Sequence, residues 1–220
     1  MTKKIILPAL IAFTVLFSSS AYSGDNSVSI KAGLLGAGLE AGRSLSDSIG
    51  ARIGINYFTY DYSATESDIE YDFSLGLKTL SVLLDWHPFR GSFRLSGGIV
   101  FNGNRLDASA TSSDTYDIGD RTYTASEVGS LDGEIDFDDV APYVGLGWDT
   151  SFGRKEGLGF LFEIGAIYQG SPRVDLSASG PIASDPDFIN NLSKEEDNLQ
   201  SALDNFTYYP VLAVGLSYRF

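Results

Sequence analysis

His87 is the only histidine of the chain, and it lies in the sequence Trp86-His87-Pro88-Phe89. A histidine can act as a general base near neutral pH, and some membrane-bound hydrolases pair one with a serine or an aspartate. The competing interpretation is an interfacial residue, because the neighbouring rings of Trp86 and Phe89 suit a membrane boundary. We favour the interfacial interpretation and expect that the chain is not an enzyme.

Carboxylates are the second group that could carry chemistry. The stretch from Asp132 to Asp139, DGEIDFDD, resembles a calcium loop at first sight, but it lacks the glycine and the glutamate that an EF-hand needs at its sixth and twelfth positions. We therefore expect no resident metal or cofactor. Weak binding of divalent cations and a merely solvated acidic loop remain as alternatives. The acidic candidates here are Asp132, Glu134, Asp136, Asp138 and Asp139.

The negative charge is concentrated in three segments. The formal net charge of the whole chain is −14. Residues 61–72 hold five acidic and no basic residues, residues 107–139 hold ten acidic residues and one basic residue, and residues 185–205 hold six acidic residues and one basic residue. If these segments share one rim, they form a negative funnel that concentrates small cations. The alternative is that charge only keeps the loops soluble. The acidic balance argues against nucleic acid as a partner, since such binding needs a basic footprint.

The N-terminal segment 1–23 has the features of a secretory signal peptide. Lys3 and Lys4 precede a short apolar run, and small residues around Ala21 and Ser23 offer a cleavage site. We therefore expect residues 24–220 to form one exported domain. The chain has no cysteine, so disulfides and cysteine metal sites are excluded.

The exported part consists mainly of segments in which apolar and polar residues alternate, the period of a β-strand. The apolar side of each segment is continuous and rich in aromatic residues, whereas the other side carries glycines, small residues and isolated charges. This is the pattern of a transmembrane barrel with lipid outside and a polar lumen inside. The expected strands cover residues 27–43, 50–62, 71–86, 93–107, 140–152, 158–171 and 207–220.

These strands must position the isolated charges. An unpaired buried charge is costly, so lumen charges should pair with one another. A salt-bridged plug is the favoured interpretation, and a narrow gated path is the alternative. The expected lumen charges are Arg52, Asp85, Arg94, Asp149, Glu163 and Arg219. The last strand ends on Tyr218 and Phe220, an alternation that resembles the assembly signal of outer-membrane proteins.

The number of strands and two local features need separate predictions. Bacterial barrels normally have an even number of strands, so we expect eight, with the first segment dividing near Gly36 or a further strand unrecognised. A phase change near Lys78 predicts a β-bulge in the third segment. Ser193 and Glu196 have capping-box spacing, which predicts a short helix over 193–203 in the last long loop.

Most of the exported part of the chain resembles the CarO-type outer-membrane proteins, chiefly from about Val140 onward. The resemblance is carried by APYVGLG at residues 141–147, by FEIGAIYQGSPRV at residues 162–174, and by the following acidic helical stretch and terminal strand; DRTYTA at residues 120–125 is also similar. The resemblance implies a largely closed barrel of eight strands. It also implies a link to the uptake of small or basic amino acids such as ornithine, and to carbapenem susceptibility.

The sequence thus predicts an all-β protein, an antiparallel up-and-down β-barrel of eight strands in the outer membrane of a Gram-negative bacterium. The expected function is a narrow or gated path for small, cationic solutes. The alternative is a structural or adhesive barrel whose acidic loops bind lipopolysaccharide, divalent cations or a surface partner. The expected partners are outer-membrane lipid and lipopolysaccharide, the barrel-assembly machinery and small cationic solutes.

Overall fold

The computed structural model describes residues 26–66 and 69–220, so the predicted signal peptide lies outside the described residues. Eight antiparallel strands close into a barrel, in which each strand pairs with the next and the last pairs with the first. The predicted fold class and the expected number of strands are therefore confirmed. The barrel strands are β1 (Asn26–Gly33), β2 (Gly36–Ser44), β3 (Ile49–Glu66), β4 (Ile69–Trp86), β5 (Phe93–Asn102), β10 (Val140–Asp149), β11 (Gly157–Tyr168) and β13 (Tyr208–Arg219).

The first predicted segment is two strands, which accounts for the eighth. β1 and β2 pair along their whole length and are joined by Leu34 and Leu35 alone. Gly36, which follows this turn, has a φ of 87°, a left-handed conformation that glycine adopts without strain. This turn lies at the same rim as the long connections, so that rim carries one short turn as well.

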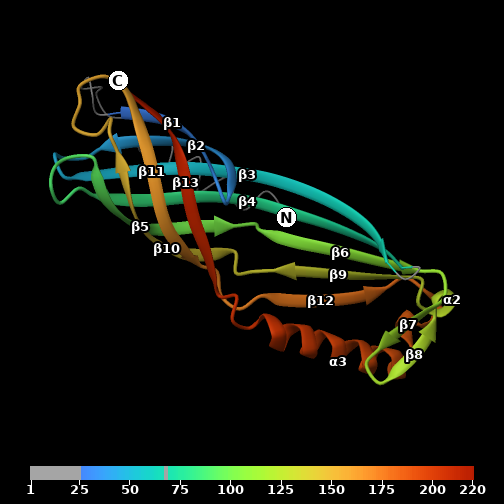
Figure 1. Ribbon diagram of the computed structural model, residues 1–220. Helices are drawn as coiled ribbons and strands as arrows, with labels where there is room; N and C mark the ends of the chain where they lie inside the picture. Colours follow the sequence, from blue (N-terminus) through green and yellow to red (C-terminus); the bar gives the residue numbers. More distant parts are fainter. Residues whose placement is uncertain (1–25, 67–68) are drawn as a thin grey trace.

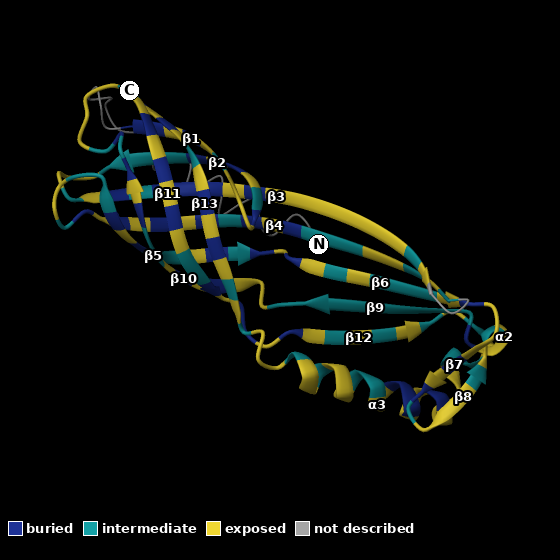
Figure 2. Ribbon diagram, in the orientation of Figure 1, coloured by how far each residue is buried: buried dark blue, intermediate teal, exposed yellow. Residues whose placement is uncertain are grey.

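The outer wall of the barrel is apolar and exposed. Phe160, Leu158 and Val144 are 72%, 68% and 68% exposed, which is the reverse of a soluble β-protein. Aromatic residues flank this wall: Trp148 lies 5.3 Å from Phe93 near one rim, measured between ring centroids. At the other rim Tyr168 lies 5.1 Å from Tyr208. An apolar wall between two aromatic girdles identifies a transmembrane barrel. Figure 2 shows the exposed residues alternating with buried ones along these strands.

The wall continues on one side as a flat sheet beyond the barrel (Figure 1). The far halves of β3 and β4 remain paired up to Glu66 and Ile69, and three further strands lie beside β4. We call these five strands the extension sheet, and we call the rim from which it rises the loop rim. Segments outside the expected strands, including residues 63–66 and 69–70, are therefore strand. The additional strands are β6 (Arg105–Ser112), β9 (Ser130–Asp136) and β12 (Arg173–Ala178).

A small cap with its own apolar core lies at the far end of the extension sheet (Figure 1). It contains the hairpin of β7 (Thr115–Ile118) and β8 (Arg121–Thr124), the turns α2 (Ala125–Val128) and η1 (Pro181–Ser184), and the first turns of the helix α3 (Pro186–Leu203). The rest of α3 runs back along β12 toward the barrel. Its buried residues are Tyr116, Ile118, Val128, Phe188 and Leu192. No helix in the described part of the chain is long and apolar enough to cross a membrane.

The helix was predicted in the correct loop but with the wrong start. α3 begins at Pro186, and its N-cap is Asp185, whose carboxylate accepts hydrogen bonds from the backbone N–H groups of Asp187 and Phe188. Proline is favoured in the first turn because its missing N–H would have no partner there. Ser193 and Glu196 therefore lie inside the helix and do not form its cap.

The predicted β-bulge near Lys78 is wrong. β3 and β4 pair without interruption from Ile49 and Trp86 to Glu66 and Ile69. The phase change has another cause, a change in what the outward side of the sheet faces. Within the barrel the outward side of the sheet is apolar because it faces lipid; in the extension sheet the same side faces water and is polar. The change occurs at Tyr57 and Lys78, which are directly opposite one another, with the ammonium group 5.8 Å from the ring centroid.

Candidate functional site

The lumen of the barrel holds a network of buried charges. Among the described residues, four basic and four acidic side chains point into it, each 8% exposed or less. Equal numbers make the network neutral, which is the condition for keeping charges away from water. All six expected lumen charges lie here; Lys31 and Glu40 were missed, although both alternate with outward apolar neighbours. The eight residues are Lys31, Arg52, Arg94, Arg219, Glu40, Asp85, Asp149 and Glu163.

Arg52 is the centre of this network. Its guanidinium group binds both carboxylate oxygens of Glu163, at 2.9 and 3.0 Å, and donates to Glu40 at 2.8 Å. It also donates to Asp85 at 3.1 Å and to the hydroxyl of Ser96 at 3.1 Å. Charge-assisted bonds of this forked geometry are the strongest that side chains form. Arg52 therefore joins β2, β3, β4, β5 and β11 from inside.

Arg94 is held much more loosely in the same network. Its nearest carboxylate oxygens lie at 3.6 Å in Glu163, 3.9 Å in Asp149 and 4.0 Å in Asp85. Its Nε and Nη2 atoms are buried without a hydrogen-bond partner. A buried donor without a partner costs free energy, so Arg94 is the cation that the network loses most readily.

Tyr143 separates the charged layer from an apolar one. Its hydroxyl donates a 2.5 Å hydrogen bond to Glu163, and its ring belongs to the apolar layer. A Cβ atom at Gly145 or Gly165 would overlap this hydroxyl group, so these two glycines give the tyrosine its place across the lumen. The space beside these two lumen glycines is thus filled by one neighbouring side chain.

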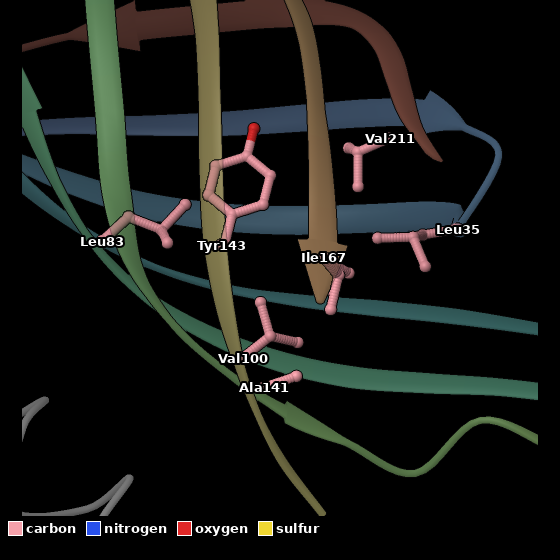
Figure 3. Packing of buried hydrophobic residues seen from close by; sticks show 7 residues of the cluster. All are labelled: Leu35, Leu83, Val100, Ala141, Tyr143, Ile167 and Val211. Atoms are coloured by element: carbon pink, nitrogen blue, oxygen red, sulfur yellow. The ribbon is translucent and has the colours of Figure 1, made fainter. Parts of the chain in front are cut away.

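The apolar layer closes the lumen at the loop rim (Figure 3). Leu35 enters it from the turn between β1 and β2, and this turn is fixed by a 2.7 Å hydrogen bond from the hydroxyl of Tyr209 to the carbonyl of Leu34. We call this cluster the apolar plug. It consists of Leu35, Leu83, Val100, Ala141, Tyr143, Ile167 and Val211.

The opposite end of the lumen is closed by stacked side chains. The ring of Phe152 stacks on His87 with 3.3 Å between the centroids, and the guanidinium group of Arg219 lies 5.1 Å from the ring centroid of Phe152. His87 is 2% exposed, and its Nδ1 lies 2.8 Å from the carbonyl oxygen of Gly91. The cavity above this stack measures about 20 Å³, room for one water molecule. The lumen is therefore closed at both ends.

The acidic residues expected around the mouth do not form a funnel into the lumen. Asp132, Glu134 and Asp136 lie on the outer side of β9 in the extension sheet, and Arg173 binds Asp136 at 2.8 Å and Asp138 at 2.9 Å. The backbone carbonyl of Asp139 accepts a hydrogen bond from Asn102. The side of the sheet that continues the lumen is apolar, and at its far end Ala110, Leu131 and Leu176 pack against the core of the cap.

The outer side of the extension sheet carries two neighbouring rows of carboxylates and hydroxyl groups around a groove of about 600 Å³. Ser74 donates to Asp61 at 2.6 Å and Ser109 donates to Asp132 at 2.6 Å. In the described residues no three histidine or acidic side chains converge as metal ligands. The first row consists of Asp61, Ser74, Asp107, Glu134 and Asp175. The second row consists of Ser63, Asp72, Ser109, Asp132 and Ser177.

Comparison with known proteins identifies the fold. No protein-family model matches the chain, and no curated protein matches it. Two crystal structures of Acinetobacter baumannii proteins are similar to it. CarO2 is 20% identical with a TM-score of 0.59, over 91% of this chain and 100% of that chain. CarO is 19% identical with a TM-score of 0.57, over 90% of this chain and 98% of that chain. The predicted resemblance is thus confirmed at the level of the fold, a closed eight-stranded barrel with a helix near the C-terminus.

Proposed function

We propose that the chain is a non-enzymatic barrel of the bacterial outer membrane, and that its lumen is a gated path for small cationic solutes. The exposed apolar wall between aromatic girdles supports the membrane location, since it would be unstable in water. The loop rim then faces the outside of the cell. Basic amino acids are the solute class that the sequence resemblance implies.

One observation carries this proposal, the weakly held guanidinium group of Arg94 among three carboxylates. An ammonium or guanidinium group of a solute can take the same position, because it carries the same charge and also offers several N–H donors. The exchange keeps the network neutral when the Arg94 side chain withdraws. An anionic solute would instead add to the four carboxylates of the lumen, which is unfavourable.

The closed lumen makes this path a gated one. A solute must first displace the apolar plug, so the resting barrel should conduct little. The acidic outer side of the extension sheet does not lead into the lumen, so the charge network itself has to supply the preference for cations.

Uptake into proteoliposomes tests the proposal. We expect lysine to enter faster than glutamate, and Arg94→Met to lower the KM for lysine because the solute no longer competes with a resident cation. Arg105→Met is the matched control, since Arg105 lies on the exposed outer side of the extension sheet and binds Glu134. Lysine uptake no greater than that of an inert eight-stranded barrel, or an unchanged KM in Arg94→Met, contradicts the proposal.

A second candidate function is supported by the acidic rows of the extension sheet. They lie on the outer side of the wall just beyond Tyr57 and Lys78, where the lipid-facing surface ends. In the outer membrane this is the level of the lipopolysaccharide phosphates, which carboxylates can approach only with divalent cations between them. A structural barrel of this kind should retain lipopolysaccharide with Mg²⁺ and lose it with chelator. The double variant Asp72→Asn, Asp132→Asn should lose it in both conditions; equal retention by this variant excludes the role.

A further inference from the structure

The two edges of the extension sheet differ in whether another segment of the chain covers them. At one edge, α3 lies beside β12 and supplies partners for its backbone. The carboxylate of Glu196 accepts a 2.8 Å hydrogen bond from the N–H of Leu176. The side-chain amide of Gln200 donates to the carbonyl of Pro172 at 2.7 Å. This edge is therefore closed to any further strand.

The opposite edge, formed by the far half of β3, is open. The pairing of β3 with β2 ends at Tyr57, and from Phe58 to Glu66 no other strand of the described residues lies on that side. β3 is paired there with β4 alone. The chain thus leaves nine residues of regular strand with one free edge, which we call the β3 edge.

The direction of the backbone groups at the β3 edge follows from the register. In an antiparallel pair, successive residues direct their N–H and C=O groups alternately to one side and the other. The N–H of His87 donates to the carbonyl of Ser48 at 2.8 Å, so the even-numbered residues of β3 bond to β4. The odd-numbered residues therefore direct both groups to the free side. They are Thr59, Asp61, Ser63 and Thr65.

The two faces beside this edge differ in chemistry. On the outer side the edge carries Asp61, which is diagonal to Asp72 of β4. Neither Thr59–Glu66 nor Ile69–Leu77 contains a basic residue. On the inner side it carries Tyr60 and Tyr62, which are 56% and 53% exposed. A strand added here would place alternate side chains against carboxylates and against aromatic rings.

The β3 edge also lacks the usual protections. Exposed edges are commonly blocked by lysine, proline, a bulge or a covering segment, because free backbone groups recruit other strands. Phe58–Glu66 has no lysine or proline, its register with β4 is continuous, and its residues from Phe58 to Ser63 are exposed. An open edge of this length, opposite one that is closed, indicates a binding surface.

We propose that the β3 edge binds an extended segment of a partner protein by strand addition, and that this segment alternates basic with apolar residues. Its backbone pairs with the four odd-numbered residues of the edge. Its basic side chains face the carboxylates of the outer side, and its apolar side chains cover Tyr60 and Tyr62. This surface lies outside the lumen, so the inference is independent of solute passage.

A second copy of the chain is a poorer occupant of the edge. A symmetric pair would join the two β3 strands antiparallel across a two-fold axis. Two copies inserted alike in one membrane are related by an axis along the membrane normal. Such an axis leaves both strands rising away from the membrane, so they cannot pair in this way.

A synthetic nonapeptide of alternating lysine and valine tests the proposal with the purified full-length barrel in detergent. We expect binding by fluorescence anisotropy, and slower amide hydrogen exchange at Thr59, Asp61, Ser63 and Thr65. Ser63→Pro removes an outward N–H without touching the bonds to β4 and should weaken binding at least tenfold. Ser63→Ala is the matched control, since both changes remove the hydroxyl that bonds Asp72. Asp61→Lys, which keeps the backbone intact, should also weaken binding.

Several outcomes overturn the proposal. One is that the peptide does not bind the wild-type barrel, and another is that it binds Ser63→Pro as tightly as Ser63→Ala. If a peptide of alternating glutamate and valine binds as tightly as the lysine and valine peptide, the carboxylates of the outer side do not select a basic partner. A dimer of the barrel that dissociates in Ser63→Pro assigns the edge to a second copy instead. If Ser63→Pro does not fold, unchanged peptide affinity in Asp61→Lys is the overturning result.

Discussion

The hydroxyl of Tyr143 and the Nη2 atom of Arg52 donate to the same oxygen of Glu163, at 2.5 and 3.0 Å. Tyr143 belongs to the apolar plug and Arg52 to the charge network, so Glu163 is the residue at which the two layers of the lumen meet. Any movement of the plug that carries Tyr143 away leaves this carboxylate with one donor fewer. Opening the lumen is thereby coupled to the charges beneath the plug.

Tyr143→Phe tests that coupling. The ring remains in the plug, but the buried carboxylate loses a hydrogen bond, which should lower the free energy of unfolding by about 1–3 kcal/mol. Urea unfolding in detergent micelles, followed by the fluorescence of Trp86 and Trp148, measures the change. Tyr168→Phe is the control because Tyr168 lies on the lipid-facing wall. Equal stability of the two variants would contradict the coupling.

Arg52 and Arg94 should differ in their contributions to stability although both are buried among carboxylates. Arg52→Met breaks several short charge-assisted bonds and should cost about 3–5 kcal/mol. Arg94→Met removes only contacts of 3.6 to 4.0 Å and two donors without partners, so its cost should be clearly smaller. The same urea experiment compares the two. A cost for Arg94→Met that equals or exceeds that of Arg52→Met would show that Arg94 is not the weakly held cation.

Burial lowers the pKa of His87 below its ordinary value of 6.5, and Arg94 acts in the same direction. The hydrogen bond with the Gly91 carbonyl and the charges of Asp85 and Asp149 oppose this shift. The unfolded chain therefore takes up the proton first as the pH falls. The contribution of His87 to stability is complete above about pH 6.5 and declines between that value and the lower pKa of the folded state.

Unfolding free energies of the wild type and of His87→Gln, measured from pH 8 to pH 5, isolate this contribution. We expect the wild type to lose stability below about pH 6.5 more steeply than the variant. Parallel curves for the two proteins would mean that His87 is not held neutral by its surroundings.

Asp185 should determine where α3 begins. Asp185→Ala removes the side chain that accepts from Asp187 and Phe188, and loss of an N-cap costs about 0.5–2 kcal/mol. Amide hydrogen exchange in the first turn of α3 should become faster while exchange in the barrel stays unchanged. Asp187→Ala is the control, since that carboxylate does not cap the helix. Faster exchange in both variants to the same extent would place the start of the helix elsewhere.

Alternation and composition predicted most of the barrel. The lumen charges Arg52, Asp85, Arg94, Asp149, Glu163 and Arg219 were recognisable because each follows an outward apolar residue in a regular alternation. Lys31 and Glu40 follow the same pattern, but the glycines around the first turn interrupt the alternation there. Which charge pairs with which could not be predicted, since the pairs join residues far apart in the sequence, 111 positions in the case of Arg52 and Glu163.

The extension sheet could not be predicted from the same signals. The sequence shows a phase change near Lys78, and a bulge was the local explanation for it. The actual cause is that a straight strand passes from lipid to water, so that the apolar side of the sheet changes from the outer to the inner face. Acidic residues such as Asp132 and Asp136 were assigned to loops for the same reason, because they lie in strands whose outer side faces water.

Uptake of lysine and glutamate by the double variant Leu83→Ala, Val100→Ala tests most directly the claim that a closed plug lies above a cation-selective network. Both side chains belong to the apolar plug, and as aliphatic groups they form no hydrogen bond with the charge network. The variant should therefore open the lumen at the loop rim and leave the charge network in place. We expect lysine uptake to rise at least tenfold over the wild type while glutamate uptake stays near that of empty liposomes. An equal rise for both solutes, or no rise for either, would contradict the account.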